Sequence, residues 1–384
     1  MLTFRRTLDL PALLGRKSFF LFGPRATGKS FLVRQQLGDR AVVIDLLRSD
    51  VAFRLAADPS LLEAMLGDRR GPDSWIVIDE VQKLPGLLDE VHRLIEEKGL
   101  RFLLTGSSAR KLLRGQANLL AGRAWTAHLF PLTSAEIPRF DLARFLRWGG
   151  LPPVVTSAEP DEELRAYVRT YLQEEIQAEG IVRRIPQFSR FLATAALTNG
   201  QMLNFAQIAS DAGVPAATVR EHYHLLEDTL VGFLLPAWTK TKKRKAISTA
   251  KFYFFDTGVT HALAGTQALE RNSDLYGRSF EQWVGMELRA YLGYRRRNDD
   301  LCYWRSVHQH EVDFIVGGHT AIEAKATRRV TRRDLRGLQA LGEEGLVRRS
   351  LLVSEDRIEA RHGSIRCLPW RTFIEELWAD KLLG

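Results

Sequence analysis

The stretch from Gly23 to Ser30 constrains the fold of this chain more than any other. Its residues, Gly-Pro-Arg-Ala-Thr-Gly-Lys-Ser, match the pattern G-x-x-x-x-G-K-[ST] at every position. The apolar run Ser18–Phe22 precedes the stretch and a helical pattern follows it, which is the context in which such a loop cradles phosphates. The glycines let backbone N–H groups surround the phosphates, and the helix N-terminus adds the positive end of its dipole. The sequence therefore predicts a nucleotide-binding loop in an α/β domain.

We assign this loop to ATP. Lys29 is expected to reach the β- and γ-phosphates, and the Ser30 hydroxyl is expected to bind Mg²⁺. The residues predicted to bind ATP are Gly23, Pro24, Arg25, Ala26, Thr27, Gly28, Lys29, Ser30, Asp79 and Ser107.

Two acids follow a second apolar run. Ile76, Val77 and Ile78 place Asp79 at the carboxyl end of a buried strand, where open α/β sheets bind their ligands. We expect Asp79 to hold Mg²⁺ through water. Glu80 is suited to orient or deprotonate an attacking water, so the pair favours hydrolysis over binding alone.

Further polar candidates follow a fourth apolar run. That run ends in Thr105-Gly106-Ser107-Ser108, where a polar side chain could sense the γ-phosphate, and we favour Ser107. Arg123 could act as an arginine finger, in cis or from a neighbouring subunit. Arg110 and Arg114 compete for that role, and each of the three arginines could instead lie on the surface.

The order of the apolar runs predicts the class of fold. The runs Ser18–Phe22, Ala41–Asp45, Trp75–Asp79 and Arg101–Thr105 are short, do not alternate with polar residues and are separated by helical patterns. Such runs are typical of parallel strands buried on both faces. From about residue 135 to 235 the pattern is mostly helical. The last third mixes helices and strands, and the 384 residues suggest two or three domains.

The middle segment contains a helix-turn-helix pattern over Asn204–Leu226. Used for DNA binding, this pattern would direct Thr218, Arg220 and His222 toward a groove. Nearby acids oppose that use, and such units often serve only for packing. The basic run Lys240–Lys245 is either a solvated loop or a patch that contacts phosphate.

A carboxylate–lysine pattern lies in the last third, on the predicted strands Glu311–Val316 and Thr320–Lys325. Glu323 and Lys325 are two residues apart and therefore point to one face of their strand. Asp313 and Glu323 could bind Mg²⁺, with Mn²⁺ as an alternative, while Lys325 positions or helps to activate water against a phosphodiester. Glu281, on a predicted helix over Ser279–Leu292, is a further candidate ligand. A Glu–Lys pair at a strand edge is the alternative reading.

Arginine-rich segments flank this pattern. Arg295–Arg297 form one cluster, and a second cluster recurs at a spacing that predicts one face of a helix. Both clusters could contact a nucleic-acid backbone or lie on solvated surfaces. The second cluster comprises Arg328 together with Arg329, Arg332, Arg333 and Arg336, and the last four have the helical spacing.

Composition narrows the class of protein. With 55 Lys and Arg against 46 Asp and Glu the net charge is +9, which makes an anionic partner plausible. The two cysteines, Cys302 and Cys367, have no metal-ligand spacing and do not indicate a disulfide framework. Arg5, Arg6 and Asp9 interrupt the N-terminal apolar stretch, which argues against a signal peptide. No apolar run suffices to cross a membrane, so we expect a cytoplasmic location.

These motifs together resemble those of the prokaryotic AAA-type ATPases that carry a C-terminal DUF4143 domain. The resemblance runs from about residue 15 to the C-terminus, in the order of that family. It rests on the stretches FLFGPRATGKS, WIVIDEVQKLP, FLLTGSSARKL, LLAGRAW, FPLTSAEI, WGGLP, KFYFFDTGV, GRSFEQWVGMEL, YWR, EVDFIV and AIEAKA.

The resemblance implies an α/β chain in three parts. These are a P-loop AAA-type ATPase domain (1–134), a helical lid and winged-helix-like segment (135–250), and a PD-(D/E)XK nuclease-like α+β domain (251–384). It places Glu281, Asp313, Glu323 and Lys325 at nuclease-like positions. His308 and His310 stand in a turn where glycines are expected.

Three functions follow from these expectations. The first is an ATPase that also cleaves nucleic acid with a metal ion, with DNA favoured over RNA as the substrate. The second is an ATP-driven switch or DNA-binding regulator whose nuclease-like domain binds without cutting. The third is an ATPase that acts on a protein partner. An arginine finger acting in trans would require a homo-oligomer.

Overall fold

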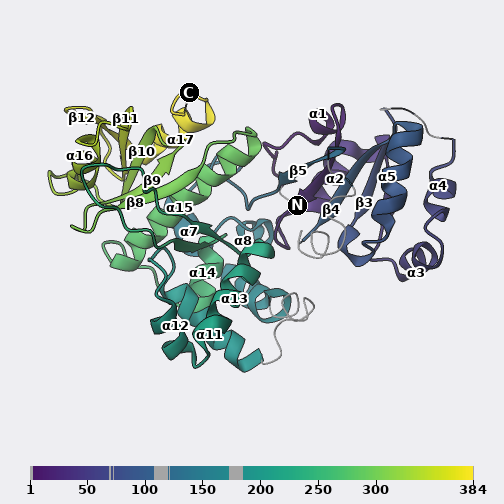
Figure 1. Cartoon of the computed structure of the whole chain (residues 1–384), viewed down its shortest axis with the longest axis horizontal. Coiled ribbons are helices and arrows are strands. Elements are labelled where there is room, and N and C mark those ends of the chain that lie inside the picture. Colours follow the sequence, from purple (N-terminus) through teal and green to yellow (C-terminus); the bar gives the residue numbers. More distant parts are fainter. Residues whose placement is uncertain are drawn as a thin grey trace. The chain divides into compact units, whose positions relative to one another are not determined.

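The computed structural model describes residues 3–68, 71, 73–107, 120, 122–172 and 185–383. They form two compact units, one of residues 3–130 with 228–231, and one of residues 131–227 with 232 to the C-terminus. Figure 1 shows the elements of each unit. No helix in the described part of the chain has the length and apolarity needed to cross a bilayer.

The smaller unit, which we call the N-terminal unit, is built on a parallel sheet with the strand order β2-β3-β4-β1-β5. The four apolar runs expected to be strands are all strands here, and β5 was not expected. Its helices and strands are α1 (Leu10–Leu14), β1 (Ser18–Phe22), α2 (Lys29–Leu37), β2 (Ala41–Asp45), α3 (Ser49–Ala57), α4 (Leu61–Leu66), β3 (Trp75–Asp79), α5 (Leu87–Lys98), β4 (Arg101–Gly106) and β5 (Ala124–His128).

Helix α5 illustrates why these segments fold as they do. Leu87, Leu88, Val91 and Leu94 recur at helical spacing and are all buried against the sheet core. The helix ends at Gly99, whose φ of 65° is the left-handed conformation that glycine adopts without strain. A helix of this kind can therefore cover the inner strands β1, β3 and β4, whose short apolar runs are largely buried. The expectation of burial on both faces is wrong for β2, which lies at the edge of the sheet and exposes Val43.

The larger unit, which we call the C-terminal unit, begins with a helical region. Its segments are α7 (Leu142–Trp148), α8 (Pro152–Thr156), α9 (Pro160–Ala166), a π-helical stretch (Tyr167–Leu172), α11 (Ile185–Leu197), α12 (Phe205–Ala212) and α13 (Ala216–Asp228). An antiparallel ribbon of β6 (Gly232–Leu235) and β7 (Lys251–Phe254) follows, and then α14 (Thr257–Ala264).

A mixed sheet in the order β12-β13-β11-β10-β9-β8 completes this unit. Strands β10, β11 and β13 are parallel, whereas β8, β9 and β10 form an antiparallel meander. The segments are α15 (Asp274–Tyr294), β8 (Leu301–Arg305), β9 (Glu311–Val316), β10 (Thr320–Lys325), α16 (Arg336–Gly342), β11 (Arg349–Ser354), β12 (Ala360–His362), β13 (Ile365–Pro369) and α17 (Trp370–Trp378). A parallel sheet followed by a mixed one confirms the expected α/β class.

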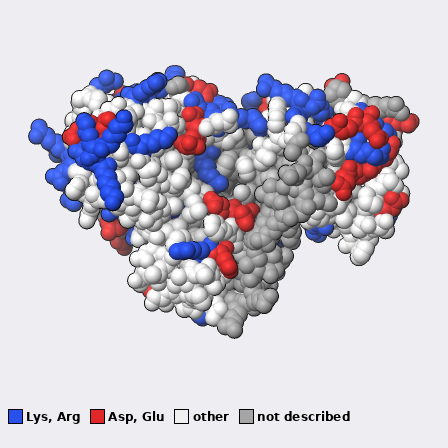
Figure 2. All heavy atoms as spheres, in the orientation of Figure 1, with Lys and Arg blue, Asp and Glu red and all other residues white. Residues whose placement is uncertain are grey.

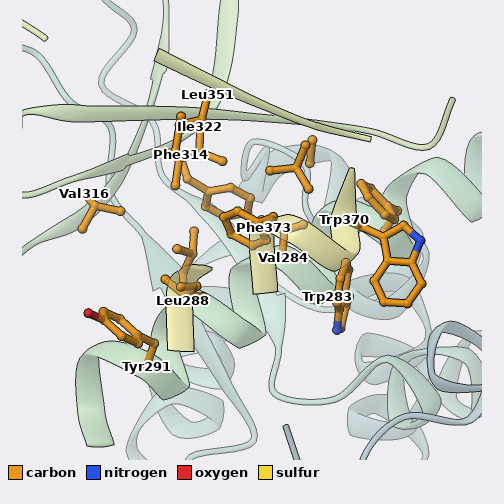
Figure 3. Close-up of a cluster of buried hydrophobic side chains, with 14 of the residues drawn as sticks. Trp283, Val284, Leu288, Tyr291, Phe314, Val316, Ile322, Leu351, Trp370 and Phe373 are labelled. Carbon is orange, nitrogen blue, oxygen red and sulfur yellow. The ribbon is translucent and has the colours of Figure 1, made fainter. Parts of the chain in front are cut away.

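Helix α15 is the central element of the C-terminal unit. Figure 3 shows its side chains Trp283, Val284 and Leu288 in one cluster with residues of the mixed sheet and α17. Gly285 lets the helix approach the sheet, because a Cβ there would lie 3.0 Å from the Phe314 ring. The same core includes Phe145 of α7 and Tyr253 of β7. The helical region and the mixed sheet therefore share one core, and the boundary expected at 250/251 falls between β6 and β7. The three-part division stays a prediction.

A buried carboxylate joins the helical region to α14. Asp256 is fully buried, its Oδ2 accepts from Gly150 N at 2.7 Å, and its Oδ1 accepts from Val259 N at 3.0 Å. Gly149 must be glycine, because a Cβ would lie 2.0 Å from Asp256 Oδ1. Burial raises the pKa of Asp256 to about 6, although the backbone N–H donors oppose that shift. This contact therefore links two segments that lie about 100 residues apart in the sequence.

We predict that Asp256→Ala lowers the free energy of unfolding by about 2–4 kcal/mol, because it leaves buried N–H donors without an acceptor. Asn204→Ala is the matched control, since Asn204 caps α12 at the surface through Gln207 N at 3.1 Å and should cost about 1 kcal/mol. Urea denaturation followed by circular dichroism measures both. Equal losses in the two variants would contradict this role for Asp256.

Candidate functional site

The loop Gly23–Ser30 connects the carboxyl end of β1 to α2. Gly28 has a φ of 91°, which only glycine adopts readily, and it caps the start of α2. A Cβ on Gly23 would lie 2.4 Å from Leu129 O, so the loop passes directly over the chain that leaves β5. The two glycines of the motif thus serve the loop's conformation and its close approach to backbone.

Lys29 is buried within this loop, with 7 % of its surface exposed. Its Nζ lies 2.6 Å from Gly23 O and 3.2 Å from Pro24 O. The ammonium therefore stands inside the curl of backbone where the motif predicts phosphate oxygens. Arg6 supports the loop from outside the motif, since its Nη1 donates to Thr27 O at 3.0 Å. Nothing in the sequence around Arg6 indicated that contact.

The acids lie at the same end of the sheet as the loop, because β3 and β1 are parallel and only β4 lies between them. Ser30 Oγ donates to Asp79 Oδ2 at 2.8 Å. Thr105 Oγ1, at the end of β4, donates to Asp79 Oδ1 and accepts from Glu80 N at 3.3 Å. Ser30 and Asp79 are thus within reach of one ion, and a hydroxyl with a carboxylate suits the hard cation Mg²⁺.

Glu80 has a left-handed backbone, with a φ of 60°, which turns the chain sharply after β3. Its Oε2 accepts from Gln82 Nε2 at 2.5 Å, and the same nitrogen donates to Ser107 Oγ at 3.2 Å. The predicted residues Glu80 and Ser107 are therefore brought together through Gln82. Gln82, in the turn Val81–Lys83 after β3, was not predicted. Thr105 was noted at the end of the fourth apolar run, but Ser107 was favoured there.

Arg123 lies at the opposite edge of the sheet. It precedes Ala124, which pairs with Ser18 at the amino end of β1, whereas the loop begins after Phe22. Five residues of strand span about 15 Å, so Arg123 does not reach the loop of its own chain. Its Nε donates to Glu96 Oε1 at 2.5 Å. The cis alternative for an arginine finger is therefore wrong, and a role in trans stays a prediction. Ser108, Arg110 and Arg114 lie outside the described residues.

The second group of candidates forms a cluster in the mixed sheet, which we call the carboxylate–lysine cluster: Asp313, Glu323 and Lys325. Lys325 Nζ lies 2.5 Å from Glu323 Oε1 and 3.8 Å from Asp313 Oδ2. Asp313 Oδ2 also accepts from Ala324 N at 2.9 Å, where the β9–β10 ladder has ended at Phe314 and Ile322. The two strands part at this point, and the carboxylate takes the place of a strand carbonyl.

Burial makes these carboxylates costly to ionise. Asp313 and Glu323 are 4 % and 5 % exposed. Burial, with repulsion from Glu281, raises the pKa of Asp313 to about 6. Burial and repulsion from Asp313 raise the pKa of Glu323 well above its usual range. The two carboxylates raise the pKa of Lys325 in spite of its own burial, so Lys325 is a charged donor rather than a base.

Glu281 belongs to an adjoining network around Lys251. Its Oε1 accepts from Lys251 Nζ at 2.9 Å and from Tyr253 OH at 2.5 Å. Lys251 also lies 2.6 Å from Glu311 Oε1. Burial opposes ionisation of Glu281, but Lys251 and the Tyr253 hydroxyl outweigh it and hold the pKa of Glu281 below its usual value. Lys251, Tyr253 and Glu311 were not predicted.

The cluster offers two acids to a metal ion rather than three. Within the described residues, no group of three or more His, Cys, Asp or Glu side chains is placed to hold one. One observation nevertheless fits a cation: Glu323 Oε2 is buried and has no hydrogen-bond partner among the residues that the structure describes. A divalent ion between Asp313 and Glu323 would satisfy that oxygen and offset the repulsion between the carboxylates.

Glu287 has a structural role on α15. Its oxygens accept from Ser134 N at 2.7 Å, Trp378 Nε1 at 2.9 Å and Trp283 Nε1 at 3.2 Å. Burial raises its pKa to about 7. These donors come from three separate segments, so Glu287 ties the stretch around Ser134 to α15 and α17.

Several basic candidates have structural partners. His222 is buried and stacks edge-on against Phe188 at 4.9 Å, so its predicted approach to a DNA groove is wrong. Arg220 stacks over Phe205 at 5.0 Å. In the run Lys240–Lys245, the backbone N–H groups of Lys242 and Lys243 donate to Glu344, and Arg244 pairs with Glu343.

The predicted helical face of arginines is also wrong. Helix α16 begins only at Arg336, and Arg329, Arg332 and Arg333 lie in bends and turns before it. Asp334 accounts for this, because its carboxylate accepts from Thr331 N at 2.8 Å and closes a local turn. In the other cluster, Arg295 pairs with Asp380 and Arg297 with Asp299.

Three family models match successive parts of the chain. Residues 15–138 match an AAA domain, residues 139–270 a domain of unknown function (DUF8612), and residues 276–373 a domain of unknown function (DUF4143). With the loop geometry, the first match defines the class as P-loop nucleotide-binding proteins of the AAA type. The chain joins an N-terminal AAA domain to a C-terminal DUF4143 domain, as its motifs indicated.

Curated relatives are distant. The chain is 22% identical over 339 residues to the uncharacterized protein MJ1544 of Methanocaldococcus jannaschii, covering 80% of this chain and 73% of that protein. It is 23% identical over 233 residues to an uncharacterized protein of Haemophilus influenzae, covering 56% of this chain and 57% of that one.

Solved structures give weaker likenesses. One is the ORC1 protein of Aeropyrum pernix in complex with DNA, with a TM-score of 0.26, 13% identity and coverage of 65% of this chain and 87% of that one. Another is a DNA polymerase III gamma subunit-related protein of Thermotoga maritima, with a TM-score of 0.27, 9% identity and coverage of 97% of each chain. At these TM-scores neither likeness bears on function.

For the AAA domain we predict that Thr105→Val lowers ATP hydrolysis about 10- to 100-fold with little change in nucleotide affinity, because Thr105 orients Asp79 and the backbone of Glu80. Phosphate release and fluorescent-nucleotide titration measure the two effects. Ser107→Ala is the comparison, and a greater loss of hydrolysis in that variant than in Thr105→Val would favour Ser107 as the more important residue.

For the carboxylate–lysine cluster we predict a pH-dependent gain in stability from Asp313→Asn. The folded-state pKa of about 6 exceeds the ordinary value of 3.8, so ionisation of Asp313 destabilises the fold progressively between about pH 4 and pH 6, and the full cost is present above pH 6. In EDTA the variant should melt above wild type at about pH 8, and this difference should shrink at about pH 5. Exposed Asp300→Asn should show neither effect. A variant less stable than wild type at both pH values would contradict this electrostatic account.

Proposed function

We propose that the protein hydrolyses ATP in its AAA domain and cleaves phosphodiester bonds of nucleic acid, with DNA favoured over RNA, in its C-terminal unit. The observation that supports cleavage most strongly is the contact of Lys325 with Glu323, beside Asp313. A cation and two buried carboxylates, one with an unpartnered oxygen, form an arrangement suited to phosphoryl chemistry.

Asp313 and Glu323 would hold Mg²⁺ or Mn²⁺. When bound, such an ion supplies Lewis-acid stabilisation of phosphoryl oxygens and lowers the pKa of water. Lys325 donates to Glu323, and in the reaction it would donate to a non-bridging oxygen or orient the attacking water. Hydrolysis adds one water: a P–O bond to the water oxygen forms, the ester P–O bond breaks, and the leaving oxygen takes a proton.

Glu281 supports this site from the side in our proposal. Because Lys251 and Tyr253 hold its Oε1, Glu281 would contribute as a charged neighbour or through its other oxygen. In the AAA domain, Lys29, Ser30 and Asp79 would hold ATP and Mg²⁺, while Glu80 would orient the attacking water. Arg123 would act only on a neighbouring subunit, which would require a homo-oligomer. We also expect the protein to be located in the cytoplasm.

One observation favours the alternative, a switch or regulator that binds nucleic acid without cutting it. Lys325 and Lys251 already neutralise the carboxylates, and the described residues hold no group of three candidate ligands. A domain with this charge balance could be stable without a metal and serve for binding alone.

Purified protein incubated with supercoiled plasmid and with single-stranded DNA, in Mg²⁺ or Mn²⁺ and with or without ATP, tests the proposal. We predict cleavage that Asp313→Ala abolishes and that the exposed control Asp300→Ala keeps. Lys29→Ala should abolish ATP hydrolysis, and its cleavage lane shows whether ATP controls the nuclease. ATP hydrolysis with no cleavage under any condition would leave the binding alternative.

A further inference from the structure

A large trough in the C-terminal unit is not part of either candidate site. Its volume is 1090 Å³. The segment Arg139–Ala143 before and within α7 forms one wall, and the loop Glu355–Ile358 after β11 forms another. The start of α17 and two separate arginines, Arg271 and Arg328, complete the lining.

Strand polarity brings this trough toward the carboxylate–lysine cluster. Strands β10, β11 and β13 are parallel, with Lys325 paired to Ser354 and Ser354 to Pro369. The residues that follow these three positions leave the sheet at the same edge, and two strand spacings put Pro369 about 10 Å from Lys325. Arg328 follows Lys325 by three residues. An extended ligand that occupies the trough could therefore reach Lys325.

Three of the four acids that line the trough are engaged in local contacts. Asp141 accepts from Arg144 N at 3.1 Å and caps α7. Asp356 accepts from Arg357 N at 2.8 Å in a tight turn. Glu355 pairs with Arg271 at 2.9 Å. These three carboxylates serve the fold but keep their negative charge, and exposed Glu375 is the fourth acid of the lining. Because five arginines line the trough, its net charge is +1.

Three arginines of the trough differ from these acids. Within the described part of the chain, the exposed guanidinium groups of Arg139, Arg328 and Arg357 make no hydrogen bond and no ion pair. Arg371 adds a fourth positive charge and stacks over Trp370 at 4.3 Å. Unpaired guanidinium groups that converge on one hollow are suited to bind phosphate, because their planar donors match its oxygens.

The aromatic residues of the lining indicate which phosphate ligand fits. Trp370 is only 9 % exposed and packs edge-on against Trp283 at 5.9 Å. Phe140 stacks on the same Trp283 at 5.9 Å. Trp370 therefore belongs to the core and offers little surface on which a base could stack, and Phe140 is partly buried against the same core. Recognition would rest on phosphates alone, as in contacts to a nucleic-acid backbone.

We propose that this trough binds the sugar–phosphate backbone of a nucleic-acid strand that extends toward Lys325. The inference rests on the proposed function, since it names the surface that would hold the substrate of the carboxylate–lysine cluster. A separate basic surface competes with it. Figure 2 shows Lys and Arg side chains gathered around α16 and β12, and Arg332, Arg333 and Arg336 lie just before and at the start of α16.

The test measures binding apart from cleavage. Full-length protein in EDTA, without nucleotide, is titrated into a fluorescent single-stranded oligonucleotide and its duplex at several salt concentrations. We predict that Arg139→Gln, Arg328→Gln and Arg357→Gln together weaken binding about tenfold or more and reduce the salt slope by about 2–3. The matched control removes the same charge with Arg332→Gln, Arg333→Gln and Arg336→Gln, and it should change affinity less than about threefold.

Each outcome separates this inference from the proposed function. Equal losses in the two triple variants, or a loss only in the control, overturn the trough even if plasmid cleavage occurs. Selective loss in the trough variant without any plasmid cleavage supports the trough and leaves a protein that binds but does not cut. Competition by adenosine monophosphate at concentrations near those of the oligonucleotide would overturn the backbone assignment in favour of a nucleotide pocket.

Discussion

Parallel strands share one direction, and both the nucleotide site and the trough of this protein depend on that constraint. In the N-terminal unit the carboxyl ends of β1, β3 and β4 bring the phosphate loop, Asp79 and Thr105 to one edge. In the C-terminal unit the parallel strands β10, β11 and β13 do the same for Lys325 and the residues that line the trough. Backbone N–H and C=O groups within the strands are hydrogen-bonded to neighbouring strands. Polar side chains at the carboxyl ends of the strands are therefore the groups that remain available to ligands.

Buried charge is the second organising feature. Asp256 and Glu287 are structural carboxylates, each surrounded by N–H donors from separate segments. Asp313 and Glu323 are equally buried but receive fewer donors and face each other across Lys325. The first pair stabilises the fold through satisfied hydrogen bonds, whereas the second pair retains unfavourable repulsion. Repulsion of this kind is common where a protein keeps charge available for chemistry.

Local sequence patterns predicted much of the fold and of the candidate sites. The strand–loop–helix context of Gly23–Ser30 and the apolar runs before Asp79 and Thr105 predicted the N-terminal sheet, because short non-alternating runs mark strands buried on both faces. The strands that bear Asp313 and Glu323 were predicted at their observed bounds. The arginines before α16 were misjudged, since helical spacing alone ignores the turn that Asp334 closes. His222 was misjudged because its sequence neighbours do not reveal Phe188, which covers it.

The sequence by itself determined the nucleotide loop, the acids that follow β3 and the Asp–Glu–Lys spacing, because each depends on residues close together in the chain. Only the tertiary structure decided which residues support them. Arg6 meets Thr27, Lys251 meets Glu281, and Glu287 meets Ser134 and Trp378 across long stretches of chain. It likewise placed Arg123 at the far edge of its sheet and gathered Arg139, Arg328 and Arg357 around one trough. Such contacts arise from strand order and helix packing, and no local pattern encodes them.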